Sequence, residues 1–190
     1  MKNIGIDCRF WGIKHAGLGR YTRELVLSIL RQNQDFAFTL FFQKGDFGQD
    51  QKLLKNHRIV EVEIPHYSLK EQLFFGQIVD RQKLNFVHFM HFNVPMFLQT
   101  PFVVTIHDLI KHFFKGKPVT TRSLPIYWLK YGGYRLIIGK AIKNAKEIIV
   151  PSYFTKDQIT LEYPEVLDEK IHVIYEGVSS PYDLNSKLKT

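Results

Sequence analysis

Histidine and aspartate directly follow an apolar run at His107 and Asp108. Polar residues at the carboxyl end of a buried strand lie at the edge where open α/β sheets bind their ligands. An imidazole is useful there because one nitrogen can contact a ligand while a neighbour fixes the other. We expect His107 to contact a ligand and Asp108 to orient the loop or His107. The alternative is a histidine at a strand end that is satisfied by backbone groups.

A second candidate site lies near the N-terminus, where Gly17 and Gly19 join a predicted strand to an amphipathic helix. The free N–H groups and the dipole at a helix start favour phosphate or carboxylate. Glycine lets such a ligand approach the backbone closely. We expect an anion to bind at Gly17 and Gly19, with Arg20 in reach. The alternative is a tight helix start that needs glycine for backbone reasons alone.

Two nucleotide-binding motifs are excluded by their spacing. Residues 12–17 have the glycine spacing of a P-loop, but Leu18 and Gly19 stand where lysine and serine or threonine are needed. Gly17 and Gly19 begin a dinucleotide fingerprint, but Thr22 occupies the third glycine position. The glycine loop therefore needs another explanation.

The elements that must position these residues alternate between strands and helices. Apolar runs predict strands near 3–8, 36–42, 58–64, 85–89, 102–106, 147–151 and 171–175. Helical spacing predicts helices near 17–33, 68–83, 120–144 and 152–162. This order predicts an α/β fold with a doubly wound, mostly parallel sheet covered on both faces.

Composition indicates one globular domain of 190 residues with 45% hydrophobic residues. We place the domain at 1–178 and interpret 179–190 as the start of a linker. The one cysteine, Cys8, lies in a predicted strand, which favours a buried thiol in a reducing compartment. Because the chain starts with a strand and has no long apolar run, we expect a cytoplasmic protein.

The net charge of +8 is concentrated in one segment. Residues 111–146 hold nine Lys/Arg residues and no Asp or Glu, interleaved with aromatic residues. Such a segment suits an anionic membrane surface, so we expect peripheral attachment at the inner face of the membrane. The candidate membrane-facing residues are Lys115, Lys117, Arg122, Lys130 and Arg135. The alternative is an ordinary basic helix covering the sheet. Because no recognition motif accompanies the charge, we expect no nucleic-acid partner.

Five motifs occur in an order that resembles a known family. They are Ile4-Gly-Ile-Asp7, Gly17-Leu-Gly-Arg-Tyr-Thr-Arg-Glu-Leu25, Val104-Thr-Ile-His-Asp-Leu109, Ile149-Val-Pro-Ser152 with Thr155, and Val173-Ile-Tyr-Glu-Gly-Val178. Together they resemble the N-terminal domain of the retaining family 4 glycosyltransferases of GT-B fold. The resemblance implies a Rossmann-like domain that binds the acceptor, while a second domain holds a nucleotide-sugar donor.

The resemblance also implies roles for individual residues. His107 would be catalytic, by contacting the donor sugar or stabilising charge near the anomeric carbon, and Gly17, Gly19 and Arg20 would approach the donor phosphates. The expected acceptor-binding residues are Trp11, Lys14, His15, His91, Asn93 and Asp108. His88 and His91 lack a third clustered ligand, so we expect neither a metal nor another cofactor besides the nucleotide-sugar co-substrate.

The family's donor domain, with its pair of glutamates, is expected to be absent from these residues. Glu63 and Glu71 have the spacing of that pair, but they fall in the first domain, and we interpret the match as coincidence. We expect retaining hexosyl transfer to a glycan or lipid-linked acceptor in envelope or exopolysaccharide synthesis, with the isolated chain inactive. The alternative is a non-catalytic acceptor-binding or membrane-docking subunit of a two-chain transferase.

Overall fold

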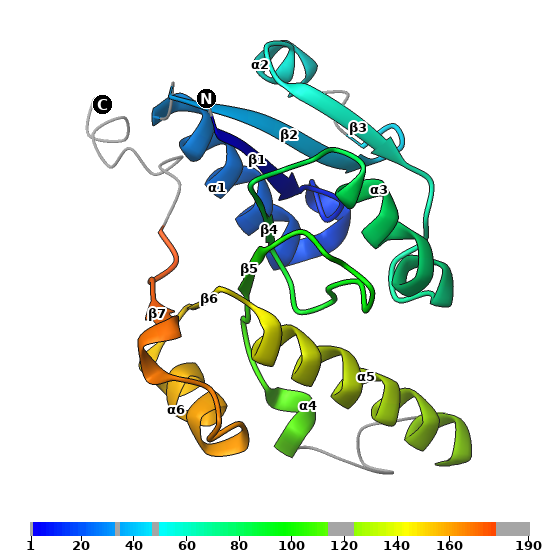
Figure 1. The fold of residues 1–190 in the computed structure, drawn as a ribbon, viewed down its shortest axis with the longest axis vertical. Coiled ribbons are helices and arrows are strands. Elements are labelled where there is room, and N and C mark those ends of the chain that lie inside the picture. Colours follow the sequence, from blue (N-terminus) through cyan, green and yellow to red (C-terminus); the bar gives the residue numbers. More distant parts are fainter. Residues whose placement is uncertain (1, 33–34, 47–49, 114–123, 178–190) are drawn as a thin grey trace, which may run out of the picture.

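The computed structural model describes residues 2–32, 35–46, 50–113 and 124–177. These residues form a seven-stranded sheet in the order β3-β2-β1-β4-β5-β6-β7, with every neighbouring pair parallel (Figure 1). The strands are β1 (Lys2–Asp7), β2 (Phe36–Gln43), β3 (Arg58–Val62), β4 (Phe86–Phe89), β5 (Phe102–Thr105), β6 (Glu147–Val150) and β7 (Ile171–Val173). The predicted α/β fold and all seven predicted strands are confirmed.

The helices connect these strands. The longer ones are α1 (Ala16–Gln32), α5 (Leu124–Asn144) and α6 (Tyr153–Glu162). The shorter ones are η1 (Ile13–His15), α2 (Gln51–Leu54), η3 (Glu71–Phe75), α3 (Gly76–Asp80), α4 (Ile110–Phe113) and η5 (Asp168–Lys170). The helix predicted over 68–83 is present, but it begins as the π-helical turn η3 and continues as α3. The predicted linker at 179–190 lies outside the described residues.

The sheet buries a core on each face. One core packs α1 and α2 against the sheet through residues such as Val26, Leu27 and Leu54. The other packs α3, α5 and α6 through residues such as Val79 and Ile142. Strands that are covered on both faces must be apolar on both sides, which explains their nearly continuous apolar runs.

The buried face of α1 includes a polar residue. Leu18, Tyr21, Leu25 and Ile29 have helical spacing, but the fully buried line of α1 runs through Thr22 and Val26. Thr22 is tolerated inside because its hydroxyl donates a hydrogen bond of 2.9 Å to the carbonyl oxygen of Leu18. Tyr21 is thereby left at the margin of the core, facing the carboxyl ends of the strands.

The predicted burial of Cys8 is confirmed, and Ser152 caps a helix. The Cys8 thiol is fully buried, and burial raises its pKa well above the ordinary value. Ser152 precedes α6 and its hydroxyl accepts a hydrogen bond of 3.2 Å from the backbone N–H of Thr155. Cys8 is therefore an inert core residue, and Ser152 is a helix N-cap.

Candidate functional site at the carboxyl edge of the sheet

The sheet order changes direction between β1 and β4. Crossovers from β1 lead through β2 to β3 on one side, while β4 to β7 follow on the other. Ligands of open α/β sheets bind outside the carboxyl ends of the strands at such a switch point. The segments that leave the two strands there are 8–15 and 90–101. These segments and the end of β5 form the candidate site.

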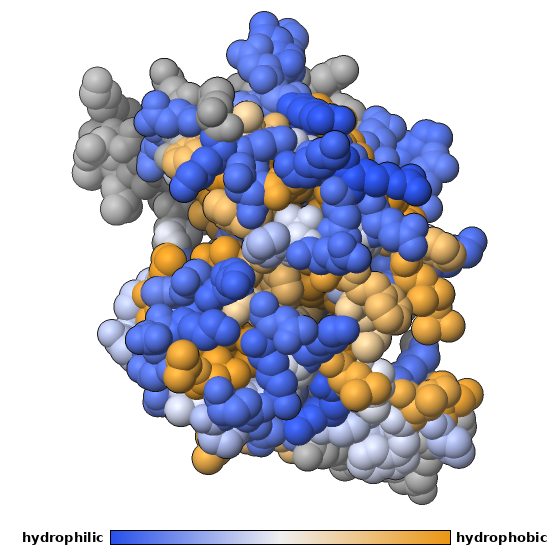
Figure 2. Space-filling view, in the orientation of Figure 1, coloured by the Kyte–Doolittle hydropathy of each residue, from blue (hydrophilic) through white to orange (hydrophobic). Residues whose placement is uncertain are grey.

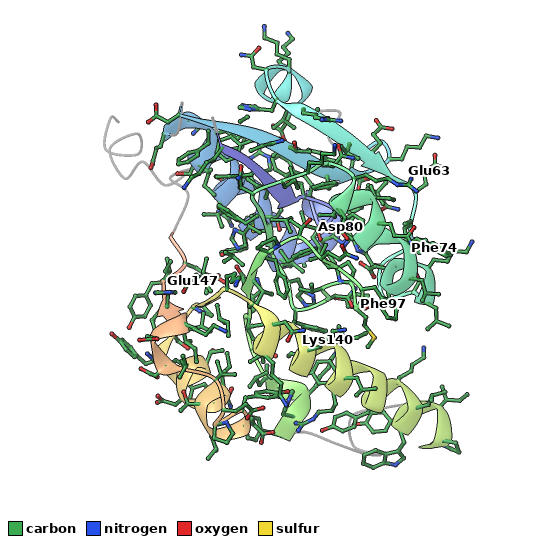
Figure 3. The ribbon with its side chains drawn as sticks, in the orientation of Figure 1. Glu63, Phe74, Asp80, Phe97, Lys140 and Glu147 are labelled. Carbon is green, nitrogen blue, oxygen red and sulfur yellow. The ribbon has the colours of Figure 1, made fainter. Side chains whose placement is uncertain are left out.

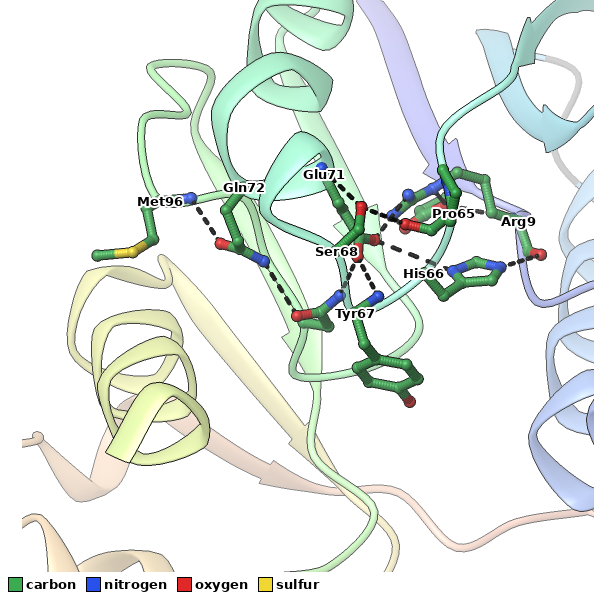
Figure 4. A network of polar contacts seen from close by, with 10 residues as sticks. Arg9, Pro65, His66, Tyr67, Ser68, Glu71, Gln72 and Met96 are labelled. Carbon is green, nitrogen blue, oxygen red and sulfur yellow. Dashed lines mark hydrogen bonds and ion pairs between the residues drawn. The ribbon is translucent and has the colours of Figure 1, made fainter. Parts of the chain in front are cut away.

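A buried ion-pair network supports the first of these segments (Figure 4). The Arg9 guanidinium donates two hydrogen bonds of 2.8 Å to the Asp7 carboxylate, and its third nitrogen lies 2.7 Å from Glu71 Oε1. Arg9 has 0% exposure, and its charge lies over the Phe75 ring at 3.5 Å. Asp7 also accepts the Arg9 backbone N–H at 3.2 Å. Asp7 therefore ties down the loop that follows β1.

Glu71 extends the same network to two other segments. Its Oε2 accepts hydrogen bonds of 2.6 Å from the Tyr67 backbone N–H and from the Asn93 amide. Gln72 continues the chain, donating to Asn93 at 3.0 Å and accepting from the Met96 N–H at 3.1 Å. Burial raises the pKa of the Glu71 carboxyl, while the Arg9 charge opposes that rise. The network joins the segments after β1, β3 and β4.

This placement explains the apparent glutamate pair. Glu71 is fully buried in the network, while Glu63 is exposed and pairs with Lys44. The two side chains therefore make different contacts within this domain. Asn93, expected to bind the acceptor, is buried between Glu71 and Gln72 and positions the segment after β4 instead.

His107 lies at the carboxyl end of β5 beside Tyr21, with the two rings perpendicular and 4.7 Å apart. Its Nε2 lies 3.0 Å from the Met90 carbonyl oxygen, and its Nδ1 lies 3.1 Å from Glu176 Oε1. A carbonyl oxygen can only accept, so Nε2 carries a proton and the orientation of the ring is fixed. Nδ1 faces the half-exposed side chain of Glu176, which a ligand could replace.

A buried histidine, His88, is linked through Thr105 to the tyrosine that lies beside His107. His88 Nε2 lies 2.9 Å from the Thr105 hydroxyl, which is 3.4 Å from the Tyr21 hydroxyl. His88 is buried, and burial lowers its pKa to about 4, so it is neutral at physiological pH. Asp108 is exposed and its carboxylate accepts the Ile110 N–H at 2.9 Å, so it fixes the start of α4.

Aromatic rings and imidazoles gather around Phe10 in the loop after β1. The Phe10 ring stacks on His66 with centroids 4.1 Å apart. Its other neighbours are His15 at 5.3 Å, His91 at 5.3 Å and Tyr67 at 6.2 Å. We call these five residues the Phe10 cluster. Of the expected acceptor-binding residues, the structure brings His15 and His91 together here.

Trp11 and Lys14 have partners outside the cluster. Trp11 is buried against Phe42 in the core on the α1 face, and its indole N–H donates to Asp50 at 3.1 Å. Lys14 is exposed and pairs with Asp46. Trp11 therefore stabilises the loop from inside, contrary to the expectation that it lines a ligand surface.

The two glycines at the start of α1 have different surroundings. A Cβ on Gly19 would lie 2.0 Å from the Gly12 carbonyl oxygen and 2.9 Å from that of Phe10. A Cβ on Gly17 would meet nothing within 4 Å. Gly19 is therefore required by the contact between α1 and its own preceding loop, while the exposed Gly17 leaves room for a ligand. Arg20 is exposed on the same turn.

Four residues that the sequence analysis did not assign are central to this edge: Arg9, His66, Tyr67 and Glu71. Ser68 and Glu71 have the spacing of a capping box, and the Glu71 N–H donates to the Ser68 hydroxyl at 3.1 Å. That spacing is the signal that could have located the start of η3. Nothing in the local sequence indicates that Arg9 pairs with Glu71.

The basic segment is described only in part. Lys115, Lys117 and Arg122 lie outside the described residues. Lys130 is exposed, whereas Arg135 pairs with Glu162 at 2.9 Å. Among the described helices, none combines the length and the apolar character needed to cross a bilayer.

A cavity of about 290 Å³ lies between the segment 94–102 and the second half of α5. Lys140 lines it, donating to the Met96 carbonyl oxygen at 2.5 Å beneath Phe97, and Figure 3 shows both side chains. Phe102, the first residue of β5, also lines the cavity. The cavity therefore lies at the amino end of this strand, away from His107. Across the described ranges, no three His, Cys, Asp or Glu side chains form a group that could hold a metal ion.

Solved structures share this fold over about half of their own length. HepE of Anabaena, in complex with UDP and glucose, is 16% identical with a TM-score of 0.55, covering 98% of this chain and 49% of that one. The lipopolysaccharide outer core galactosyltransferase WaaB is 15% identical with a TM-score of 0.52, covering 94% of this chain and 46% of that one. UDP-GlcNAc 2-epimerase from Neisseria meningitidis, bound to UDP-GlcNAc, is 12% identical with a TM-score of 0.53, covering 91% and 46%.

No curated protein matches the sequence significantly. The family model described as Glycosyltransferase Family 4 matches residues 15–180, which include most of the sheet and the segments that carry His66, His91 and His107. The chain belongs to glycosyltransferase family 4.

Proposed function

We propose that this chain is the acceptor-binding N-terminal domain of a retaining hexosyltransferase. The observation that carries the proposal is the convergence of His107, Tyr21 and the Phe10 cluster at the switch point of the sheet. Acceptor and donor would meet there, between this domain and a second one. Because the similar structures are about twice as long, the second domain is the place for the donor.

The proposed donor is a nucleotide sugar. Two of the similar structures were solved with UDP and glucose or with UDP-GlcNAc, and an exposed first turn of α1 at Gly17 suits a phosphate. Gly19 would serve this site indirectly, by letting α1 start close to its loop. Neither a metal nor another cofactor is part of the proposal.

The chemistry would depend on positioning and charge stabilisation. In the proposed front-face reaction, the departing phosphate takes the proton from the acceptor hydroxyl, so the chain needs no carboxylate base. Asp7 and Glu71, the buried carboxylates nearest the site, are both committed to Arg9, which agrees with this mechanism. His107 would exchange Glu176 for the donor and stabilise charge near the anomeric carbon through Nδ1.

The experiment uses the full-length product of the gene with UDP-sugars and an oligosaccharide acceptor panel. Transfer with retained anomeric configuration is expected, and His107→Asn should lower kcat by about 100-fold or more. The 190 residues alone should give no transfer, because half of the reaction site would lie on the donor domain. Inverted configuration, or full activity of the His107→Asn variant, would refute the proposal.

A second candidate function is membrane docking, either within the transferase or as a non-catalytic subunit of a two-chain enzyme. It is favoured by large apolar side chains on the surface of α5, where Leu129 is 78% exposed and Ile126 51%. Figure 2 shows apolar residues gathered over η3 and over the first half of α5. Attachment at the inner face of a membrane would suit a lipid-linked acceptor of envelope or exopolysaccharide synthesis.

A further inference from the structure

The cavity at the amino end of β5 has a wall that the rest of the domain holds in place. This wall is the segment 94–102. The Gln72 side chain accepts the Met96 N–H at 3.1 Å (Figure 4). The Asp80 carboxylate accepts the N–H of Thr100 at 2.8 Å and its hydroxyl at 2.6 Å. A wall fixed in this way can receive a ligand without rearranging, as most small-molecule sites do.

A lysine reaches the cavity from α5. The Lys140 ammonium donates to the Met96 carbonyl oxygen at 2.5 Å and lies 5.6 Å from the centre of the Phe97 ring (Figure 3). An ammonium group has three N–H donors, and the described residues supply a hydrogen-bond acceptor for one of them. The other two donors are therefore available to a ligand.

The lining of the cavity is basic. Lys140 and Lys146 both line it, and none of the described residues of the lining is acidic. Within the described ranges, neither lysine pairs with a carboxylate. The rest of the lining combines apolar side chains with the neutral polar residues Gln99, Thr100 and Asn144. Two cations without a carboxylate partner on the wall of one cavity favour an anionic ligand.

The acidic groups close to the cavity are engaged elsewhere. Asp80 is satisfied by the hydrogen bonds that it accepts from the segment 94–102. Glu147 follows Lys146 in the sequence, but its carboxylate pairs with His172 on β7 at 2.6 Å. The carboxyl end of α5 contributes about half a negative charge, which two full positive charges exceed. The lysines therefore remain the charged groups that a ligand meets.

We propose that this cavity binds a small organic anion. Lys140 and Lys146 would hold its phosphate or carboxylate group through charge-assisted hydrogen bonds, and its carbon chain would lie against the apolar part of the lining. The volume of about 290 Å³ is at the lower end for ligand sites, which limits the ligand to a small molecule. Because the site lies at the opposite end of β5 from His107, it does not depend on the proposed transfer reaction.

An NMR titration that follows the backbone amide signals of the 190-residue chain tests the site. The probes are glycerol 3-phosphate and malate, each compared with glycerol and with sodium chloride at equal ionic strength. We expect the organic anions to shift the signals of Gln99, Thr100 and Lys146 with a Kd of about 0.1–1 mM. Glycerol and sodium chloride should leave these signals unchanged. Binding of either anion supports the site, and the tighter one identifies the preferred anionic group.

Three lysine substitutions locate the binding. Lys140→Met and Lys146→Met should each weaken it about five- to tenfold, because each removes one charged contact. Lys143→Met is the matched control, since Lys143 lies on the same helix but pairs with Glu165 at 2.7 Å and does not line the cavity. This control should bind within about twofold of the parent. Lys146 is exposed, so its variant tests the site even where Lys140→Met unfolds through loss of the bond to Met96.

Three results would overturn the inference: shifts no larger than those with sodium chloride, equal binding of glycerol, or an equal loss of binding by Lys143→Met and Lys140→Met. The last result would mean that the lysines act only as diffuse charge that complements the carboxyl end of α5. Shifts confined to Gly17 and Gly19 would also overturn it, while supporting the phosphate site proposed at the start of α1. Sugar transfer by the full-length product tests the proposed function separately, because transfer does not require this cavity.

Discussion

At the scale of single residues, the buried His88 makes the stability of this protein depend on pH. His88 sits inside the sheet and is neutral in the folded state, with its pKa lowered by burial to about 4. In the unfolded chain a histidine takes up a proton near pH 6.5. The unfolded state therefore binds more protons between these values, so the free energy of unfolding falls as the pH falls through that window.

This gives a prediction for His88→Gln, which removes the titration and keeps a polar side chain. For the parent we expect the contribution of His88 to fall by roughly 3 kcal/mol between pH 6.5 and pH 4. The variant should lose less stability over that range, measured by urea unfolding at several pH values. The exposed His172→Gln should resemble the parent. Identical pH profiles for His88→Gln and the parent would contradict the assignment.

Gly17 and Gly19 give a matched pair of substitutions. Gly19→Ala forces a Cβ against the Gly12 carbonyl oxygen at 2.0 Å, so it should destabilise the protein by about 1–3 kcal/mol or more. Gly17→Ala meets open space and should stabilise it by about 0.4–1 kcal/mol. Urea unfolding followed by circular dichroism measures both. Equal changes in stability for the two variants would contradict the close contact between Gly19 and the loop that precedes α1.

At the scale of elements, the network of Asp7, Arg9 and Glu71 connects β1 to η3. Both carboxylates depend on one guanidinium that is inaccessible to water. Removing one member of a buried ion pair leaves its partner as an uncompensated charge. Removing both members leaves less uncompensated charge. The relative positions of η3, Tyr67 and the loop after β1 should therefore depend on the pair rather than on either residue alone.

A double-mutant cycle tests this dependence. Arg9→Met should cost about 3–5 kcal/mol of the free energy of unfolding, because two carboxylates remain buried without their partner. Arg9→Met with Glu71→Gln should cost clearly less than the sum of the single changes. Urea unfolding measures the four proteins. Additivity within about 0.5 kcal/mol would mean that the two side chains act independently.

At the scale of the whole molecule, exposed apolar side chains lie within the most basic stretch of the sequence. The first half of α5 presents Ile126, Trp128 and Leu129 to solvent, and it projects away from the sheet in Figure 1. It lies within the stretch that holds nine of the 26 basic residues and none of the acidic ones. Apolar insertion and electrostatic attraction would act at the same surface.

Vesicle co-sedimentation tests this surface. Anionic vesicles should bind the protein more strongly than neutral ones, because each basic residue near the lipid contributes about 1 kcal/mol. Leu129→Ser should weaken that binding by about five- to tenfold, since it removes an inserted apolar group. Leu161→Ser, with a similarly exposed leucine on α6, is the control. Equal binding to both vesicle types would rule out an electrostatic contribution to membrane binding.

The sequence predicts the layers well and the buried network poorly. Apolar runs and helical spacing are local signals, and they placed all seven strands and α1, α5 and α6 within a few residues. Short elements such as α2 and α4 carry too few residues for a periodic signal. The exposure of Leu129 is not predictable from the sequence, because spacing alone does not say where α5 leaves the sheet.

By itself, the sequence determined the parallel α/β fold, the family and the position of His107 at a strand end. These follow from short-range patterns and motif order, which a chain displays before it folds. Only the tertiary structure decided that Gly19 serves its own loop, that Trp11 is core, and that Glu71 neutralises Arg9. It also brought His66 and Tyr67 to Phe10, because contacts between distant segments depend on how the sheet brings the carboxyl ends of its strands together.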